Sequence, residues 1–112
     1  MSLREALTAH LSSHFTEVDI ERLSSFGEHR RGKVRDLFVS DDEILMVTSD
    51  RLSAFDVVLT SIPCKGAILN AIALQAFEDT QDICPNHLLD VPHPNALRVR
   101  KAEPLPIEVM AP

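Results

Sequence analysis

The chain has 112 residues, of which 45% are hydrophobic and 25% are charged, as in a soluble globular protein and unlike a disordered or fibrous one. This length allows at most one domain, and with five Phe, no Trp and no Tyr the core is expected to consist mainly of Leu, Ile, Val and Ala. The net charge of -6 argues against nucleic-acid binding, and no apolar run approaches the roughly 20 residues of a membrane-spanning helix.

The first predicted element is a short amphipathic helix in residues 2–13, because apolar residues recur there at helical spacing. Ser2 and Glu5, three positions apart, predict a capping box at its start. His10 and His14 lie four residues apart, but no acidic or cysteine partner stands at a ligand spacing, so we predict no metal site. We assign residues 1–25 to an N-terminal helical segment.

The next predicted elements are short strands. Residues 34–39 and 44–48 are β-type runs on either side of a turn signal at residues 40–42, which predicts a hairpin. A third β-type run covers residues 55–59.

A helix is predicted from about residue 67, because its apolar residues recur at the i, i+3, i+4 interval. We expect these residues to face the core: Ile68, Leu69, Ile72, Ala73, Ala76 and Phe77. Prolines 85, 92 and 94 then predict a loop, and residues 97–101 predict another strand. This order of elements predicts an α+β fold, a mainly antiparallel sheet with flanking helices.

The sequence GEHRRGKV at residues 27–34 matches the phosphate-binding P-loop pattern except at its last position. Val34 has no oxygen for a magnesium ion, and no convincing strand precedes Gly27, so a P-loop is not favoured. The start of a β-hairpin explains the residues better: Gly32 allows a close backbone approach to a polyphosphate, and Lys33 and Arg35 supply positive charge. A solvated basic turn remains the alternative.

Three further segments carry candidate groups. In DRLSAFD at residues 50–56, Asp50 and Arg51 form a local pair in this interpretation, and Asp56 either orients a substrate or caps a turn. Lys65 stands at a Gly-containing helix entrance, where free N–H groups bind anions, or else belongs to a surface turn. Lys101 closes a β-type run before a proline-interrupted segment, which is either a purine-binding hinge or a plain linker.

Cys64 and Cys84 form no C-x-x-C pair, and nothing before them resembles a secretory signal. We therefore expect reduced thiols and a cytoplasmic location. No signature connects Cys64 to a histidine, so packing or incidental exposure is expected for it rather than nucleophilic chemistry.

Five motifs together resemble, in order, the N-terminal part of the SAICAR (phosphoribosylaminoimidazole-succinocarboxamide) synthetase family. They are GKVRD at 32–36, DRLSAFD at 50–56, IPCKG at 62–66, PNHL at 85–88 and LPIE at 105–108. The resemblance implies a nucleotide-binding α+β domain in residues 26–112, truncated before a C-terminal domain.

The resemblance also implies a reaction, the ATP-dependent joining of aspartate to the carboxylate of carboxyaminoimidazole ribonucleotide in purine biosynthesis. ATP would phosphorylate the carboxylate, and the aspartate amine would displace phosphate from the acyl phosphate. The implied cofactors are ATP and Mg²⁺, with the magnesium ligands in the missing part. The implied partners are these small molecules, with no nucleic acid or membrane involved.

Residue roles follow from the same resemblance. The groups implied to contact ATP are Gly32, Lys33, Val34, Arg35, Leu37, Lys101, Glu103, Pro104 and Leu105, with phosphates at Gly32, Lys33, Arg35 and Lys101 and adenine at residues 103–105. The groups implied to face the ribonucleotide and the acyl-transfer centre are Asp56, Lys65 and Glu108.

Two departures from the family pattern stand out. Cys64 replaces a residue that is commonly Gly or polar, and after Glu108 the chain reads VMAP instead of a Val-Arg-Gly-Tyr-like segment. We expect the isolated chain to lack ligase activity. The competing hypothesis is a non-enzymatic interaction module that binds an acidic partner through Arg30, Arg31, Lys33 and Arg35.

Overall fold

The computed structural model describes residues 2, 4, 5, 8 and 13–111. The elements in chain order are α2 (Ile20–Leu23), the 3-10 helix η1 (Ser24–Phe26), β1 (Glu28–Arg31), β2 (Arg35–Val39), β3 (Glu43–Thr48), β4 (Arg51–Ala54), β5 (Val57–Ser61), α3 (Lys65–Thr80), β6 (Leu88–His93) and β7 (Ala96–Arg100).

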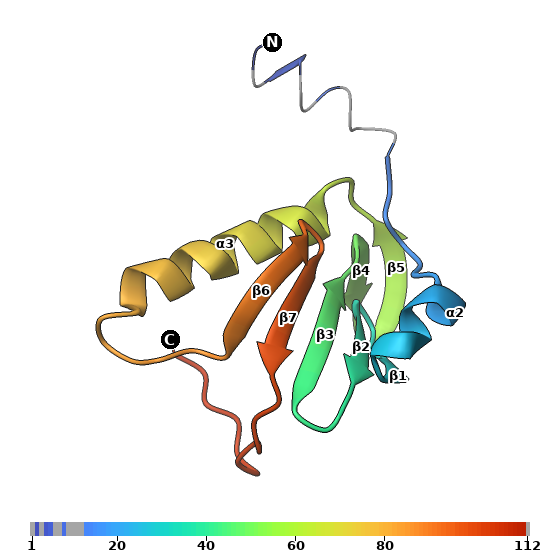
Figure 1. Cartoon of the computed structure of the whole chain (residues 1–112). Coiled ribbons are helices and arrows are strands. Elements are labelled where there is room, and N and C mark those ends of the chain that lie inside the picture. Colours follow the sequence, from blue (N-terminus) through green and yellow to red (C-terminus); the bar gives the residue numbers. More distant parts are fainter. Residues whose placement is uncertain (1, 3, 6–7, 9–12, 112) are drawn as a thin grey trace.

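The strands form a five-stranded sheet of order β1-β2-β3-β7-β6 and a separate two-stranded sheet, β4-β5. All the pairings are antiparallel. Figure 1 shows these strands and α3, which begins against the end of β3. The predicted α+β fold with a mainly antiparallel sheet is confirmed.

One face of the five-stranded sheet is covered by the segment that precedes β1. Phe38, Leu45, Val47 and Ala96 form a buried cluster on this face, and Phe15, Val18 and Leu23 pack against it. Alternation along the strands places these core residues on a single face. Burying a side chain such as Phe38 contributes about 1.5–3 kcal/mol to stability. Residues 15–23 therefore complete the core of the sheet.

Helix α3 confirms the predicted helix, but its predicted core face is only partly right, since Ala73 and Phe77 are half-buried and the other four residues are exposed. Ile68, Leu69 and Ile72 are 50%, 42% and 62% exposed, whereas the buried residues of the helix are Gly66 and Asn70. A Cβ at Gly66 would lie 2.3 Å from the carbonyl oxygen of Thr48. The small residue lets the helix start directly against the end of β3, and this close approach selects which side of the helix is buried.

The predicted hairpin is confirmed as β2 and β3, and the predicted last strand is β7 within one residue. The predicted third strand at 55–59 is displaced, because Phe55 and Asp56 form the turn between β4 and β5. The predicted loop at residues 85–94 is wrong, since it contains β6. Pro92 is tolerated because β6 lies at the edge of the sheet and its pairing with β7 is irregular.

Most of the helix predicted in residues 2–13 lies outside the described residues. The described part includes the predicted capping box. The N–H of Ser2 donates to the carboxylate of Glu5, and the N–H of Glu5 donates to the Ser2 hydroxyl.

Candidate functional site

The loop between β1 and β2 is a tight hairpin turn made of Gly32, Lys33 and Val34, called the β1–β2 turn below. The N–H of Gly32 donates to the carbonyl of Arg35 at 2.7 Å and closes the turn. A P-loop needs a helix after its glycine-rich segment, whereas strand β2 begins here at Arg35. The structure therefore supports the hairpin interpretation over the P-loop.

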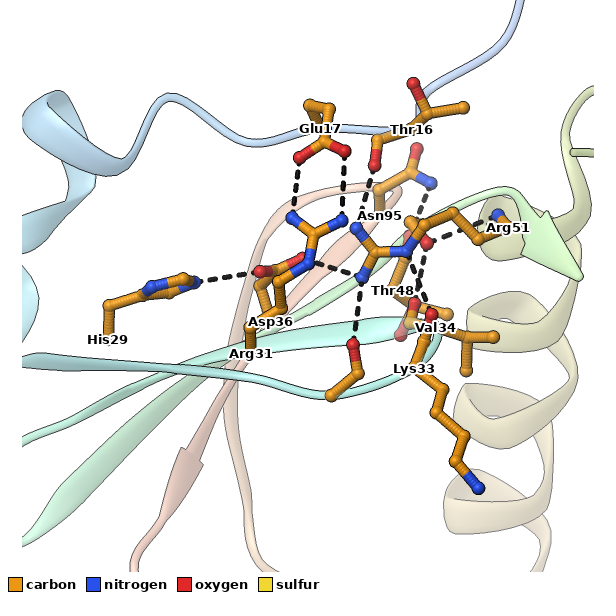
Figure 2. Close-up of polar contacts among 12 residues, drawn as sticks. Thr16, Glu17, His29, Arg31, Lys33, Val34, Asp36, Thr48, Arg51 and Asn95 are labelled. Carbon is orange, nitrogen blue, oxygen red and sulfur yellow. Dashed lines mark hydrogen bonds and ion pairs between the residues drawn. The ribbon is translucent and has the colours of Figure 1, made fainter. Parts of the chain in front are cut away.

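The guanidinium of Arg51 holds this turn from inside the protein (Figure 2). Its Nε donates to the carbonyl of Lys33 at 3.0 Å, and one Nη lies 3.4 Å from the carbonyl of Gly32. The other Nη donates to the carbonyl of Thr16 at 2.9 Å. One side chain thus connects the turn to the segment that covers the sheet.

Asp36 balances the buried charge of Arg51. The Arg51–Asp36 bond is 3.0 Å long, and the two side chains are only 4% and 0% exposed. The second carboxylate oxygen of Asp36 lies 2.8 Å from Nε2 of His29. A buried pair satisfied in this way is costly to break, because the remaining partner would stay buried without its counter-charge.

Ser49 holds the last residue of the turn. Its N–H and its hydroxyl both donate to the carbonyl of Val34, at 3.0 and 2.7 Å. Ser49 is itself buried. All three carbonyl groups of the β1–β2 turn are therefore bonded to groups inside the protein.

Lys33 and Asp56, two of the predicted site residues, form an ion pair across two turns. In Figure 2 the Lys33 side chain extends away from the Arg51 network. Phe55 and Asp56 have φ angles of 51° and 63° at the β4–β5 turn. Such left-handed pairs are typical of two-residue hairpin turns. The turn brings the carboxylate of Asp56 to the ammonium group of Lys33.

Asp50 holds the entrance of α3, where Lys65 is the first helical residue. Its carboxylate accepts hydrogen bonds from the N–H groups of Phe15, Cys64 and Gly66, at 2.9, 3.3 and 2.9 Å. The expected local pair of Asp50 with Arg51 is wrong, because Arg51 pairs with Asp36. The expectation of free N–H groups at this entrance is also wrong for Cys64 and Gly66, whose N–H groups are already bonded to a buried carboxylate.

The remaining predicted residues lie at the other end of the sheet. Arg35 pairs with Thr48 at one end of β3, whereas Arg100 pairs with Glu43 at the other. Five residues of strand, about 17 Å, separate these positions. Lys101 follows Arg100 and donates its N–H to the carbonyl of Asp42 at 2.8 Å. The structure therefore does not bring Lys101 together with Lys33.

Beyond Lys101 the chain is exposed and has no regular secondary structure, and it carries the predicted Glu103, Pro104, Leu105 and Glu108. Lys101 and Ala102 line an open depression of about 480 Å³, together with residues of α3 and of the loop before β6. Leu37 and Val34 are both half-buried, Leu37 opposite Met46 in the sheet.

The four basic residues of the competing hypothesis do not form one patch. Arg30 and Arg31 are adjacent in β1, so their side chains leave the strand on opposite faces. Arg31 donates two hydrogen bonds to Glu17, at 2.6 and 2.9 Å. These bonds lower the pKa of Glu17 and raise the pKa of Arg31.

Sequence reasoning missed the roles of Asp36, His29, Ser49 and Arg51. A signal was present for Arg51, since an arginine three residues after the apolar strand that ends at Thr48 is close enough to the core to be buried. The identity of its partner depends on pairing between residues 15 positions apart, which a local pattern does not give.

Within residues 13–111 and the four described before them, no helix is long and apolar enough to cross a membrane. The same residues contain no group of three or more His, Cys, Asp or Glu side chains placed to bind a metal ion.

Comparison with known proteins identifies the family. Residues 28–111 match the family model described as SAICAR synthetase. The phosphoribosylaminoimidazole-succinocarboxamide synthase of Legionella pneumophila (strain Paris) is 46% identical over 83 residues, which cover 74% of this chain and 27% of that protein. The chain thus spans about a quarter of the length of such curated relatives.

Solved structures agree with this assignment. The SAICAR-synthase of Saccharomyces cerevisiae complexed with SAICAR is 30% identical, with a TM-score of 0.62 over 77% of this chain and 36% of that one. A type-2 SAICAR synthetase in complex with ADP is 28% identical, with a TM-score of 0.53 over 66% of this chain and 33% of that one. Sequence and structure together show that the chain belongs to the SAICAR synthetase family, a family of purine-biosynthesis ligases.

Proposed function

We propose that this chain forms the part of a SAICAR synthetase that binds ATP and that its β1–β2 turn receives the phosphates. The observation that carries the proposal is the held turn, which places Gly32 and Lys33 beside Arg35 at the start of β2. The complex of a type-2 relative with ADP supports a nucleotide as the ligand.

The charges at this end of the sheet suit a polyphosphate. Lys33 pairs with Asp56 in the structure, and both side chains are largely exposed. Phosphate oxygens carry more negative charge than a single carboxylate and accept charge-assisted hydrogen bonds from Lys and Arg. Bound phosphates would therefore compete with Asp56 for Lys33 and leave Asp56 to face the second substrate.

The adenine is proposed to lie at the other end of β3, against residues 103–105. One nucleotide reaches both the β1–β2 turn and residues 103–105 only when it is extended along the strands. Lys101 lies beside this adenine segment, so its proposed contact with the phosphates depends on its long side chain. Leu37 and Val34 are proposed to line the space between the two ends.

In the family reaction that we propose for the whole enzyme, ATP phosphorylates the carboxylate of carboxyaminoimidazole ribonucleotide. The amine of aspartate then attacks the acyl carbon, the amide bond forms, and phosphate leaves with the bonding electrons. This chain would contribute positioning and charge neutralisation, with Asp56, Lys65 and Glu108 facing the substrate.

Magnesium would neutralise phosphate charge in this reaction, but the described residues do not fit a protein site for it, since they contain no cluster of acidic ligands. We propose that the ion's protein ligands, and the groups needed for ligation, belong to the part of the relatives that this chain does not span. The chain alone is then expected to be inactive. Its two free thiols support the proposed cytoplasmic location.

Calorimetric titration with Mg-ATP tests the phosphate assignment. Lys33→Gln and Arg35→Gln should each weaken binding about tenfold or more, as expected for the loss of a hydrogen bond to a charged group. The matched control is Arg98→Gln, because Arg98 is opposite Leu45 and therefore lies on the face of the sheet away from Leu37. Equal affinities in wild type and in both turn variants would refute the assignment.

A further inference from the structure

The orientation of the β1–β2 turn is fixed from inside the protein. Arg51 binds the carbonyls of Gly32 and Lys33, and Ser49 binds the carbonyl of Val34 with two donors. Three successive peptide groups therefore have their oxygen atoms directed toward buried donors. A turn of three residues that is held at every carbonyl cannot rotate its peptide groups without breaking one of these bonds.

The carbonyl contacts also determine where the N–H groups point. A trans peptide group is planar, and its C=O and N–H bonds point in opposite directions. The described chain contains no cis peptide bond. The carbonyl of Gly32 shares its peptide group with the N–H of Lys33, and the carbonyl of Lys33 shares its group with the N–H of Val34. Inward carbonyls therefore turn both N–H groups outward.

These two N–H groups have no acceptor in the part of the chain that the structure describes. Lys33 is exposed and Val34 is half-buried, and the same turn carries the positive charge of the Lys33 side chain. Outward N–H groups on successive residues form a concave surface of hydrogen-bond donors that can bind an anion. An arriving phosphate group would meet the two N–H groups and the positive charge of Lys33 together.

We infer that Arg51 is the positioning residue of this phosphate site and that Ser49 supports it by holding the carbonyl of Val34, whose peptide group carries the N–H of Arg35; the inference rests on the proposed function. Arg51 is too deeply buried to contact a nucleotide, since its side chain is 4% exposed. It acts through the backbone, where it aims the N–H groups of Lys33 and Val34 at the phosphates. Asp36 holds the guanidinium in place, and His29 holds Asp36.

The planar fork of arginine is required for this role. Its Nε and Nη atoms reach the carbonyls of Lys33, Gly32 and Thr16 and the carboxylate of Asp36 at the same time. A lysine at this position would keep the positive charge beside Asp36, but its single ammonium group cannot span all of these acceptors. Arg51→Lys therefore keeps the positive charge beside Asp36 and removes the hydrogen bonds that orient the turn.

The experiment compares wild type, Arg51→Lys and Ser49→Ala with the control Arg98→Lys, all as the 112-residue chain. The probes are Mg-ATP, tripolyphosphate and adenosine, and the backbone amide signals report both binding and motion in the turn. Circular dichroism establishes that each variant is folded. A general structural defect would weaken all three probes, whereas loss of positioning weakens only the two that carry phosphates.

In Arg51→Lys we expect about tenfold weaker binding of Mg-ATP and tripolyphosphate, equivalent to about 1.4 kcal/mol. We expect unchanged binding of adenosine and increased fast motion of the Lys33 and Val34 amides. Ser49→Ala should show the same pattern with a smaller loss, because the backbone N–H of Ser49 still holds the Val34 carbonyl. Arg98→Lys should match wild type.

The possible failures are distinct. If wild type binds neither Mg-ATP nor tripolyphosphate, the proposed function is wrong, and this inference is wrong with it. If wild type binds and Arg51→Lys retains the same phosphate affinity and the same turn motion, the positioning role alone is wrong. If Arg51→Lys does not fold, Ser49→Ala decides: unchanged phosphate affinity and unchanged turn motion in that variant overturn the inference.

Discussion

Asp50 and Arg51 are consecutive in the sequence, and their charged groups hold two different loops. The carboxylate of Asp50 accepts hydrogen bonds from the entrance of α3, whereas the guanidinium of Arg51 donates to the β1–β2 turn. Because the two residues are adjacent in the chain, the hydrogen bonds of their side chains fix the distance between these two loops. Lys65 and Lys33, one on each loop, are thus held relative to each other by one dipeptide.

The first prediction concerns Asp50. Asp50→Asn keeps the shape of the side chain but replaces a charged acceptor of three N–H groups with a neutral amide. We expect the free energy of unfolding to fall by about 1.5–3 kcal/mol, the range for hydrogen bonds to a charged group. Urea denaturation measures the loss. Asp79→Asn on the exposed part of α3 is the control and should change stability by less than about 0.5 kcal/mol. Equal losses in the two variants would contradict the role of Asp50.

The second prediction concerns Cys64, whose φ of 65° is in the left-handed region. This conformation costs a residue other than glycine roughly 1–2 kcal/mol, and the greater freedom of glycine in the unfolded chain offsets part of the relief. We expect Cys64→Gly to be more stable than Cys64→Ala by about 0.5–1 kcal/mol. Thermal unfolding of the two variants tests this. If Cys64→Gly were less stable than Cys64→Ala, the left-handed backbone at position 64 would not be strained.

The third prediction concerns pH and the Glu17–Arg31 pair. The hydrogen bonds from Arg31 lower the pKa of Glu17 below its ordinary value of 4.5. A lowered pKa means that the pair stabilises the folded state fully above pH 4.5 and that this contribution is lost as pH falls through the folded-state pKa. Wild type should melt at a higher temperature than Glu17→Gln at neutral pH.

That difference in melting temperature should disappear in strongly acidic solution. Glu78→Gln, a change at an exposed residue of α3, provides the control and should track wild type over the whole range. A difference between wild type and Glu17→Gln that stays constant with pH would mean that the ionised pair contributes nothing.

The sequence predicted elements whose signals are local. The β2–β3 hairpin follows from two apolar runs around Ser40, Asp41 and Asp42, and α3 follows from apolar residues at helical spacing. The buried face of α3 was not predictable in this way, because both sides of the helix carry apolar residues. The close contact of Gly66 with the end of β3 decides between the sides, and that contact is tertiary.

The site shows the same division. Lys33 and Arg35 were identified from a basic turn, and the structure places them together at one end of β2. Arg51 follows an apolar strand as a charged residue, but its four acceptors belong to the segment before α2, to the β1–β2 turn and to β2, all at least 15 positions away. β6 was missed because Pro92 normally interrupts a strand, and only the position of a strand in the sheet reveals that it is an edge.

The central claim is that one nucleotide lies along the sheet with its phosphates at the β1–β2 turn and its adenine at residues 103–105. The most direct measurement maps backbone amide shifts in the wild-type chain during separate titrations with Mg-ATP, tripolyphosphate and adenosine. We predict that tripolyphosphate shifts residues 32–35, that adenosine shifts residues 103–105, and that Mg-ATP shifts both groups. Mg-ATP shifts that leave Gly32, Lys33 and Arg35 unchanged would contradict the claim.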